Sequence, residues 1–307
     1  MRAIFKLKFL SGVHFGAGML GGTEYSLRAD TLYSALFIEA VRKGCSEQFY
    51  SASKGGALLL SDAFPYSGAE FFLPKPMLKV ESAAGDDLVN RKKYRKLQYV
   101  PVSRWDDYLN GRLKDKDIDS VKKEFGRYEQ VHRAAVSGRE EALPYQVGTF
   151  YFDKDCGLYF IVEYKEKFDC DLVCELLKLL SYSGIGGKRS SGLGRFSVEI
   201  ASEDVCRDLC GLLDKEGGSK QMLLCGALPK EDEGSSVLTD ASYLLEKRSG
   251  FVASEAYADQ WRKKRDLYVF KVGSCFSGRF SGDIYDVSSE GGRHPVYRYA
   301  KGMFIGI

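Results

Sequence analysis

The stretch DCDLVCELLKLLSYSGIGGKRSSGLGRFSVEI, residues 169–200, contains the features that decide the fold. Its first part places leucine and valine side chains at helical spacing, and Asp169 lies where the dipole of such a helix is positive. Five glycines between residues 184 and 194 interrupt this pattern. Residues 195–200 then alternate as a strand does. We therefore predict a helix over 169–182, a glycine-rich loop and a strand.

The segments before this stretch complete a recognisable order. Residues 146–164 predict a hairpin, because they are rich in aromatic and β-branched side chains on both sides of a turn. Residues 5–9 alternate like a half-buried strand. Residues 30–43 predict a helix, with Asp30 or Thr31 suited to its amino cap. Strand, helix, strand, strand, helix, strand is the order of a ferredoxin-like domain.

A long insertion separates the first helix from the predicted hairpin. Residues 45–145 are too many for an ordinary connection, so we expect them to have structure of their own. Within them, Phe71–Pro76 is predicted to be extended, because a residue before proline favours β or polyproline geometry. Residues 110–130 have mixed charge and predict a solvated helix.

The carboxyl-terminal part of the sequence is rich in predicted strands. Four segments carry strand patterns: 243–253, 267–276, 279–287 and 296–307. We predict an α+β protein with two tandem ferredoxin-like (RRM-like) domains. The first spans residues 1–218 and contains the insertion, and the second spans residues 219–307 and is β-rich and degenerate, without a residue-level repeat.

Composition agrees with a folded protein. The chain has 307 residues, of which 44% are hydrophobic and 28% charged, and this excludes disordered and fibrous classes. No apolar run approaches the roughly 18 residues that span a bilayer, and Lys6 and Lys8 interrupt the amino end. We therefore expect a cytoplasmic protein. The net charge of +3 is mild for a nucleic-acid binder, so local basic clusters carry more information than the total.

The eight cysteines are predicted to be thiols in a reducing compartment. Cys170 and Cys174 are four residues apart, as are Cys206 and Cys210, so a zinc site of four thiolates is one alternative. Buried helical cysteine is the other. We favour the second, because neither pair has the tighter spacing of most structural zinc sites, and we expect no metal or other cofactor.

The glycine-rich loop is the strongest candidate for a binding site. Glycines permit positive φ and close backbone approach, so successive amides can converge on a phosphate while basic side chains supply charge. A side chain at one of the glycines would then block the phosphate. The predicted binding residues of the loop are Gly184, Gly186, Gly187, Lys188, Arg189, Ser190, Ser191, Gly192 and Gly194.

Known phosphate-binding patterns do not fit this loop. Arg189 follows Lys188 where a Walker loop needs serine or threonine, and Ser181 stands where its first glycine belongs. The dinucleotide fingerprint fails as well. Because the loop follows the carboxyl end of a helix, binding would depend on its own amides and cations. The alternative is a simple glycine cap, but five glycines in eleven residues exceed what a cap needs.

Several motifs together resemble a known family. The glycine loop, HFGAG at 14–18, LRADTLYSAL at 27–36 and FFLPKP at 71–76 are similar to the RAMP superfamily of CRISPR effector proteins. Within it, HPVYRYAKGMF at 294–304 resembles the family of the fourth subunit of the type III-A (Csm) interference complex. The resemblance covers nearly the whole chain. It implies tandem ferredoxin-like domains and a non-catalytic, RNA-binding structural subunit in antiviral defence.

The resemblance also implies partners. Members of that family hold the 5′ repeat-derived tag of the crRNA and dock on a large polymerase-like subunit and a backbone subunit. The chain has 40 aromatic residues and a β-rich second half, and if these form an exposed apolar patch, that patch should bind other subunits. A protein scaffold whose glycine loop contacts only protein partners is a third possibility.

An enzymatic alternative concerns His14. Related RAMP proteins that process CRISPR transcripts use histidine to remove a ribose 2′-hydroxyl proton without a metal. A metal-independent endoribonuclease with His14 as general acid or base is therefore the second reading. His132 and His294 are far away in sequence. We favour a His14 that hydrogen-bonds RNA or backbone.

Two basic clusters complete the candidate residues. The segment 88–100 combines cations with tyrosines, which suits phosphate contact and base stacking. It is our candidate for the inserted thumb hairpin that crosses the guide in related subunits, with a solvated surface as the alternative. Its predicted RNA contacts are Arg91, Lys92, Lys93, Tyr94 and Lys96. Arg262–Arg265 is weaker, because Tyr257 and Trp261 precede it at helical spacing and predict a short amphipathic helix.

Overall fold

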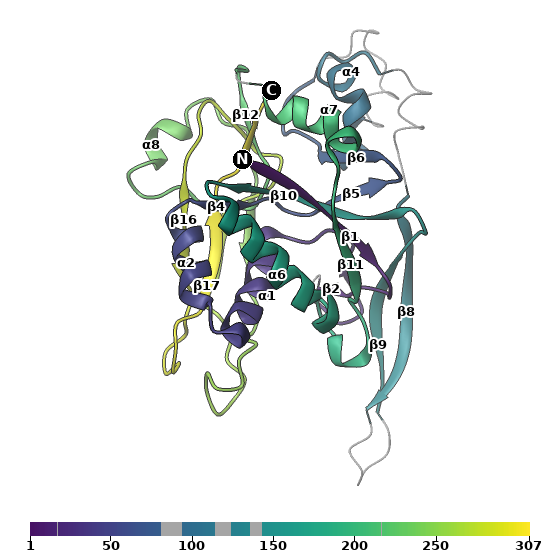
Figure 1. Ribbon diagram of the computed structural model, residues 1–307, viewed down its shortest axis with the longest axis vertical. Coiled ribbons are helices and arrows are strands. Elements are labelled where there is room, and N and C mark those ends of the chain that lie inside the picture. Colours follow the sequence, from purple (N-terminus) through teal and green to yellow (C-terminus); the bar gives the residue numbers. More distant parts are fainter. Residues whose placement is uncertain (17, 81–93, 114–123, 136–142, 216) are drawn as a thin grey trace.

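The computed structural model describes the chain except for residues 17, 81–93, 114–123, 136–142 and 216. Its central sheet is built around β1 (Arg2–Phe9), which pairs antiparallel with β10 (Cys156–Tyr164) and β11 (Phe196–Ile200). Helices α1 (Ala29–Lys43) and α6 (Lys167–Ser183) contact each other beside this sheet (Figure 1). Both predicted helices are confirmed, and so are the first and the last strand of the ferredoxin-like order in sequence, β1 and β11.

The remaining strand of this domain is not the predicted one. Short strands β4 (Leu58–Leu60) and β5 (Phe64–Ser67) pair with the edge of β10 that β1 leaves open. The predicted hairpin over 146–164 is therefore wrong in its pairing, although both segments are strands. Since both edges of β10 are occupied, β9 (Leu143–Phe152) pairs instead with β8 (Gly126–Ala135). These two ten-residue strands form an arm that projects from the molecule (Figure 1).

The insertion starts later than predicted, because α2 (Ser46–Lys54), β4 and β5 belong to the core domain. Beyond them, β6 (Glu70–Pro74) pairs with β5 and confirms the predicted extended segment. The insertion continues with β7 (Tyr99–Pro101), η1 (Val102–Arg104) and α4 (Trp105–Leu109). The helix predicted over 110–130 is wrong from residue 126 onward, because these residues pair with β9. Residues 114–123 lie outside the described part.

The second half begins after α7 (Glu203–Leu213) and is β-rich, as predicted. Each of the four predicted segments contains a strand, although some are interrupted. The elements are β12 (Gln221–Leu223), α8 (Gly234–Val237), β13 (Leu245–Arg248), β14 (Leu267–Phe270), β15 (Cys275–Phe276), β16 (Gly282–Asp286), β17 (Tyr297–Lys301) and β18 (Phe304–Gly306). One buried cluster runs through both halves of the chain, so the domain division at residues 218 and 219 stays a prediction.

The segment Tyr257–Arg265 is not helical, which corrects the expected amphipathic helix. Tyr257 is buried, whereas Trp261 is 84% exposed, so the two rings do not share one packed face. Lys263 instead forms an isolated β-bridge with Phe251. No helix among the described residues is both long and apolar enough to cross a membrane.

All eight cysteines are free thiols. Cys170 and Cys174 lie on α6, and Cys206 and Cys210 lie on α7 with their Sγ atoms 3.5 Å apart. Burial raises the pKa of Cys174 to about 11 and that of Cys210 to about 12, so both are protonated at neutral pH. Within the described ranges, no group of three or more His, Cys, Asp or Glu side chains is arranged to hold a metal ion.

Candidate nucleic-acid interface

The glycine loop connects α6 to β11 and is closed by its own hydrogen bonds. Gly184, at φ 76°, ends α6 by donating its N–H to the oxygen of Leu180 over 2.8 Å. The Ile185 N–H donates to the oxygen of Gly194, and the Gly194 N–H donates to the oxygen of Gly12, both over 2.9 Å. A Cβ on Gly194 would lie 1.9 Å from the Ile185 oxygen, so only glycine fits there. The loop is therefore fixed to the end of β1.

His14 packs directly on this loop. The Gly187 N–H donates to the His14 oxygen over 2.8 Å, and a Cβ on Gly187 would lie 2.6 Å from His14 Cδ2. A Cβ on Gly186 would lie 2.7 Å from the same oxygen. The approach of His14 thus explains glycine at positions 186 and 187 without a ligand. Their binding of RNA stays a prediction, and Gly192 alone of these three has open space where a Cβ would stand.

The ring of His14 also reaches the projecting arm. Its Nδ1 lies 2.7 Å from the oxygen of Gly148 in β9, and the side chain is buried. Because a carbonyl oxygen only accepts, Nδ1 carries a proton and Nε2 is the acceptor of the neutral ring. His132 lies in β8 opposite Gln146, while Nε2 of His294 is 2.8 Å from Ser254 Oγ. In the described structure, His14 has no second histidine within hydrogen-bond reach.

The two basic residues of the loop are placed differently. Lys188 adopts a left-handed conformation with φ 58°, and its Nζ lies 4.8 Å from the ring centroid of Tyr145 in β9. Arg189 begins the short 3-10 turn η2 (Arg189–Ser191) and makes no side-chain hydrogen bond or ion pair with any described residue. The loop therefore offers one cation held on the arm and one available to a ligand.

A groove of about 310 Å³ opens beside this loop. It is a composite site, because the two halves of the chain both contribute to its wall. Among the residues that line it are His14, Gly186, Gly187, Arg189, Arg28, Asp30, Arg248, Phe251, Lys264 and Arg298. Five of the lining residues are cations and two, Asp30 and Glu24, are acids. The sequence analysis identified the loop and His14, but it missed the arginines that surround them.

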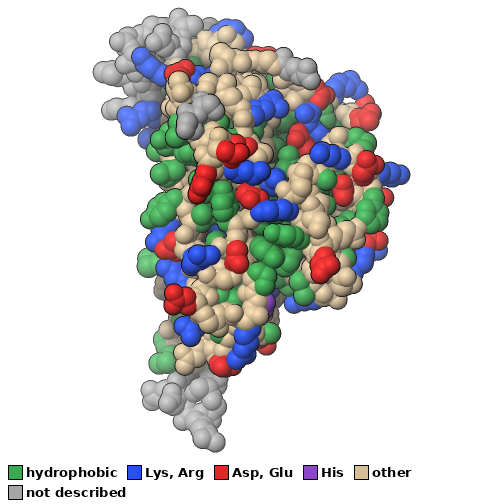
Figure 2. Space-filling model, turned by 90° about the vertical axis from the view of Figure 1, so that its left-hand side faces the viewer, with side chains coloured by type: hydrophobic (Ala, Val, Ile, Leu, Met, Phe, Trp, Pro, Cys, Tyr) green, Lys and Arg blue, Asp and Glu red, His purple; other side chains and the backbone are tan. Residues whose placement is uncertain are grey.

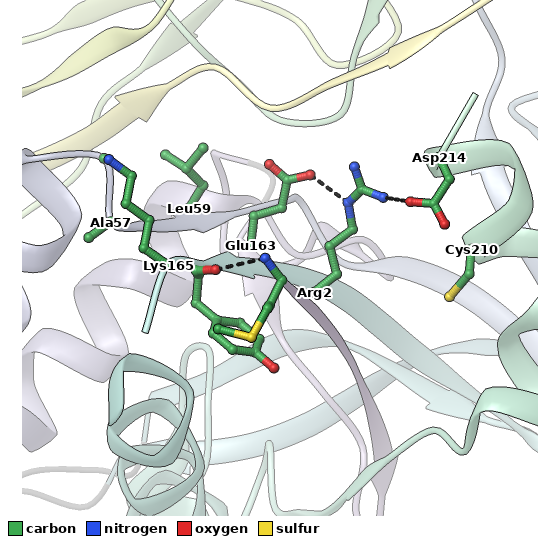
Figure 3. Close-up of a pocket in the computed structure, with 10 residues that line it drawn as sticks. Arg2, Ala57, Leu59, Glu163, Lys165, Cys210 and Asp214 are labelled. Atoms are coloured by element: carbon green, nitrogen blue, oxygen red, sulfur yellow. Dashed lines mark hydrogen bonds and ion pairs between the residues drawn. The ribbon is translucent and has the colours of Figure 1, made fainter. Parts of the chain in front are cut away.

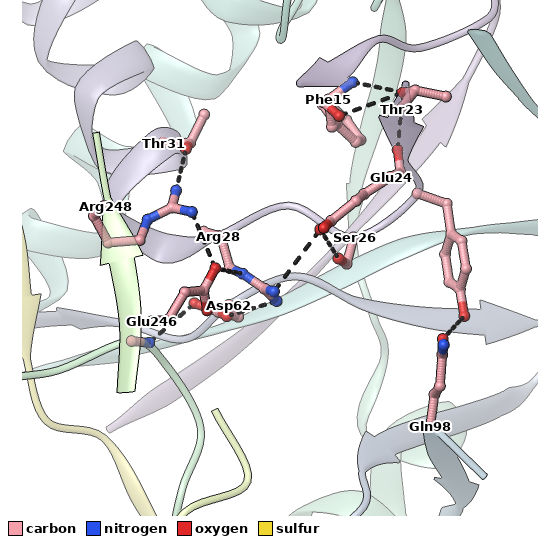
Figure 4. A network of polar contacts seen from close by, with 12 residues as sticks. Phe15, Thr23, Glu24, Ser26, Arg28, Thr31, Asp62, Gln98, Glu246 and Arg248 are labelled. Atoms are coloured by element: carbon pink, nitrogen blue, oxygen red, sulfur yellow. Dashed lines mark hydrogen bonds and ion pairs between the residues drawn. The ribbon is translucent and has the colours of Figure 1, made fainter. Parts of the chain in front are cut away.

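Three of the four arginines that line the groove belong to one polar network, and Figure 4 shows Arg28 and Arg248 in it. Arg28 lies 3.2 Å from Glu246 and 3.6 Å from Asp62. Asp30 accepts from Arg248 over 2.8 Å and also from Arg298. The LRAD motif of α1 and the HPVYRY motif of β17 therefore meet through a buried ion pair. Nothing in the linear sequence indicated this contact.

The start of α1 differs from the prediction. Neither Asp30 nor Thr31 caps the helix, because Arg28 is the capping position and its side chain makes no capping bond. The Oδ1 of Asp62, which precedes β5, instead accepts the Ala29 N–H over 2.8 Å. This distant cap leaves the carboxylate of Asp30 available for the two arginines.

The pKa values of the two buried acids of the network, Asp62 and Asp30, are shifted in opposite directions. Burial raises the pKa of Asp62 to about 6 and outweighs the attraction of Arg28. Burial also opposes ionisation of Asp30, but the charges and hydrogen bonds of Arg248 and Arg298 outweigh it and lower its pKa below the usual range. Lys264 lines the same groove, and burial together with the charge of Arg298 lowers its pKa.

The other predicted cluster is only partly described. Arg91, Lys92 and Lys93 lie outside the described residues. The ring of Tyr94 stacks on Tyr108 with centroids 5.7 Å apart, and its hydroxyl donates to the oxygen of Leu113. Lys96 is exposed at the edge of a different cavity. The described part of segment 88–100 therefore does not form the predicted hairpin.

A second cavity, of about 550 Å³, lies at the amino terminus (Figure 3). The Met1 amine donates to the oxygen of Tyr164 over 3.0 Å, and Arg2 lies between Glu163 and Asp214. Arg2 thus pairs with two acids, and none of the predicted site residues lines the cavity. Figure 2 shows one face of the molecule, on which basic and acidic side chains are interspersed. The groove, which holds both the glycine loop and His14, is therefore the candidate site.

The ferredoxin-like sheet, the glycine loop and the inserted arm define a protein of the RAMP class. The model of the RAMP superfamily matches residues 6–197, and that of the CRISPR Csm4 C-terminal domain matches residues 216–307. The chain is 36% identical over 305 residues to "CRISPR system Cms protein Csm4" of Mycobacterium tuberculosis, covering 99% of this chain and 97% of the relative. The chain belongs to the Csm4 family.

Further relatives agree with this assignment. The Csm4 protein of Streptococcus thermophilus is 37% identical over 303 residues, which cover 95% of this chain and 94% of the relative. A crystal structure of a Csm3–Csm4 subcomplex of the type III-A CRISPR-Cas interference complex has a TM-score of 0.68 at 18% identity, covering 99% of each chain. A crystal structure of a Csm1–Csm4 cassette in complex with AMPPNP has a TM-score of 0.62 at 20% identity, covering 100% of this chain and 98% of the other. At these identities the solved structures show the fold.

Proposed function

We propose that this chain is the RNA-binding structural subunit of a type III-A CRISPR ribonucleoprotein and acts in the cytoplasm. The groove beside the glycine loop would hold phosphates of the 5′ repeat-derived tag of the crRNA. The observation that carries the proposal is the excess of cations there: within the described chain, Arg189 and the Lys264 ammonium have no acidic partner within ion-pair distance. An anionic strand would supply the missing charge.

The partners follow from the solved relatives. One of them is a complex of Csm4 with Csm3, and another is a complex of Csm4 with Csm1. We propose that this chain likewise docks on a large subunit and on a backbone subunit. Exposed apolar residues of its second half, such as Leu244, Leu245 and Tyr268, offer a surface of the expected kind.

The arm of β8 and β9 is our revised candidate for the thumb that crosses the guide. Its base is tied to the glycine loop by the contacts of His14 with Gly148 and of Lys188 with Tyr145. RNA bound at the loop would therefore pass beside the arm. Deleting the outer part of the arm, residues 132–144, and closing the gap with a short glycine linker keeps Tyr145, Gly148 and the buried Phe150, and it should change the cleavage pattern of the target in the assembled complex while the crRNA stays bound.

The affinity of the full chain for a tag RNA, measured by fluorescence anisotropy at several salt concentrations, tests the groove. The variant Lys188→Ala/Arg189→Ala should bind more weakly, and the slope of log affinity against log salt should fall by about 0.7 for each phosphate that the protein no longer neutralises. The matched control is Lys154→Ala/Lys178→Ala, which removes two exposed lysines outside the groove. Equal affinities and slopes for wild type and both variants would contradict the proposal.

The same RNA separates binding from cleavage. We propose that the chain does not cut RNA, since His14 is buried and its Nδ1 is engaged by a backbone oxygen. Incubation of the full chain with repeat RNA should return the RNA intact. Cleavage that disappears in His14→Asn would instead establish the metal-independent endoribonuclease.

A further inference from the structure

Phe251 and Trp261 form an exposed aromatic pair at one side of the groove. Their ring centroids are 6.1 Å apart at an interplanar angle of 72°. Phe251 is 59% exposed and Trp261 is 84% exposed, whereas Trp105 is 2% exposed. Large aromatic rings dominate the energetics of contact surfaces, so two of them in water side by side indicate a place where something binds.

The backbone holds this pair in place. The Val252 N–H donates to the oxygen of Arg262 over 2.9 Å, and the Lys264 N–H donates to the oxygen of Gly250 over 2.8 Å. The buried ring of Tyr257 anchors the segment between them, because its hydroxyl accepts the Ser289 N–H over 2.7 Å. The two rings are therefore positioned before a ligand arrives, which reduces the entropy lost on binding.

The charges around the pair favour an anionic ligand. Phe251 lines the groove together with Arg189 and Lys264, so the pair is continuous with the phosphate site. Arg262 is exposed and makes no side-chain hydrogen bond or ion pair with a described residue. Lys263 lies 3.7 Å from an acid, Asp266, and its side chain is 56% exposed. Cations beside an exposed ring are the combination that binds single-stranded nucleic acid.

We propose that Phe251 and Trp261 are a stacking platform for a base of single-stranded RNA whose phosphates lie in the groove. The proposal rests on the proposed RNA-binding function and extends it from phosphates to a base. Any base can stack, because every base has a π-face, so the platform adds affinity without sequence preference. A protein ligand is less suited to the site, because protein interfaces are depleted in lysine and two lysines border these rings.

Trp261 reports on its own site. The full chain has two tryptophans, and only Trp261 is exposed, so a stacked base should quench its emission while that of Trp105 persists. Titration with a tag RNA should quench the wild type, and an RNA of the same length with abasic nucleotides should not. Trp261→Ala should lower RNA affinity by roughly 5- to 150-fold. Trp261→Phe should keep most of the affinity and lose the quenching.

The control variant is Phe168→Ala, which removes a 61% exposed ring on α6 that does not line the groove. It should leave affinity and quenching unchanged, and a thermal melt of each variant checks folding. RNA that binds wild type without quenching, with equal affinity for Trp261→Ala, overturns the platform but not the proposed function. RNA that does not bind at all overturns both. Loss of binding to a partner subunit in Trp261→Ala, with RNA affinity unchanged, would assign the rings to a protein contact and also overturn it.

Discussion

Replacing Asp30 by asparagine should destabilise the whole chain. Asp30 is buried and accepts from Arg248 and Arg298, which come from the other half of the sequence. Breaking a buried pair by removal of one partner costs about 3–5 kcal/mol, because a charge is left in the interior. Arg248 would keep Glu246 at 3.1 Å and Arg298 would keep the Ser249 oxygen at 3.2 Å. We therefore expect a loss of unfolding free energy at the lower end of this range, about 3 kcal/mol.

Equilibrium unfolding in urea measures this change directly. The matched control is Asp204→Asn, which removes a similar pair with Arg207 whose side chains are 87% and 76% exposed. Such a surface pair contributes about 0–1 kcal/mol. An unfolding free energy for Asp30→Asn within 1 kcal/mol of wild type would refute the reasoning that the network is a desolvated one.

The same variant should lose a pH dependence of stability. The pKa of Asp30 is lowered in the folded chain, so its contribution is complete above its unfolded pKa of about 4. The contribution is lost as the pH falls from there through the folded value. The difference in unfolding free energy between wild type and Asp30→Asn should therefore narrow as the solution becomes more acidic than pH 4, and a constant difference would contradict the ion pair.

Three further changes test other parts of the structure by the same unfolding measurement. Gly194→Ala should lower the unfolding free energy more than Gly192→Ala does. A Cβ at Gly192 has open space, so that variant should lose only about 1–2 kcal/mol for its positive φ of 83°. Equal losses for the two variants would contradict the close contact at Gly194. Tyr299→Phe should cost about 1–3 kcal/mol because the buried Leu60 N–H then lacks its acceptor, and an unchanged stability would show that water replaces it. Hydrogen bonds lower the pKa of Glu233 to about 2 and outweigh the effect of its burial. The unfolding free energy of wild type should therefore fall between about pH 5 and pH 2, and that of Glu233→Gln should fall less. Parallel plots of unfolding free energy against pH would contradict this.

The parts of the fold that the sequence predicted are those with a strong local period. Helices α1 and α6 have apolar side chains at helical spacing, and the predicted ends lie within two residues of the observed ones. β1 alternates because one of its faces is covered. In each case the side-chain pattern reports burial, and burial is what fixes the element.

Strand pairing was not predictable in the same way. The residues of β9 have a strand pattern, but this pattern does not say which strand lies beside them. The true neighbour of β10 is formed by β4 and β5, seven residues in two pieces with Pro65 in the second. Such short segments carry too few alternations to be distinguished from a loop. The prediction therefore paired β10 with β9, the nearest segment in sequence that has a strong strand pattern.

The sequence predicted the glycine loop of the candidate site, but it did not predict the charged residues around the loop. Glycine clusters are visible in a sequence because they are rare, and the loop does lie on the groove. Arg28, Arg248 and Arg298 are single basic residues in segments where most such residues are solvated. Asp30 had a local explanation as a helix cap, which concealed its distant partners. Only the fold brings these four residues together.

The network gives the groove a dependence on both halves of the chain. Asp30 and Arg28 come from the start of α1, and their partners Arg298, Arg248 and Glu246 come from the last 62 residues. Without those partners, Asp30 and Arg28 would be charged groups of the first half of the chain with no partner from the second half. With them, Arg28, Arg248 and Arg298 are held by the carboxylates of Asp30, Asp62, Glu246 and Glu24, so the charge of these arginines is balanced within the network. The ion pairs therefore hold the two halves of the chain together beside the groove, and the groove cations outside these pairs, Arg189 and Lys264, are the proposed contacts for RNA.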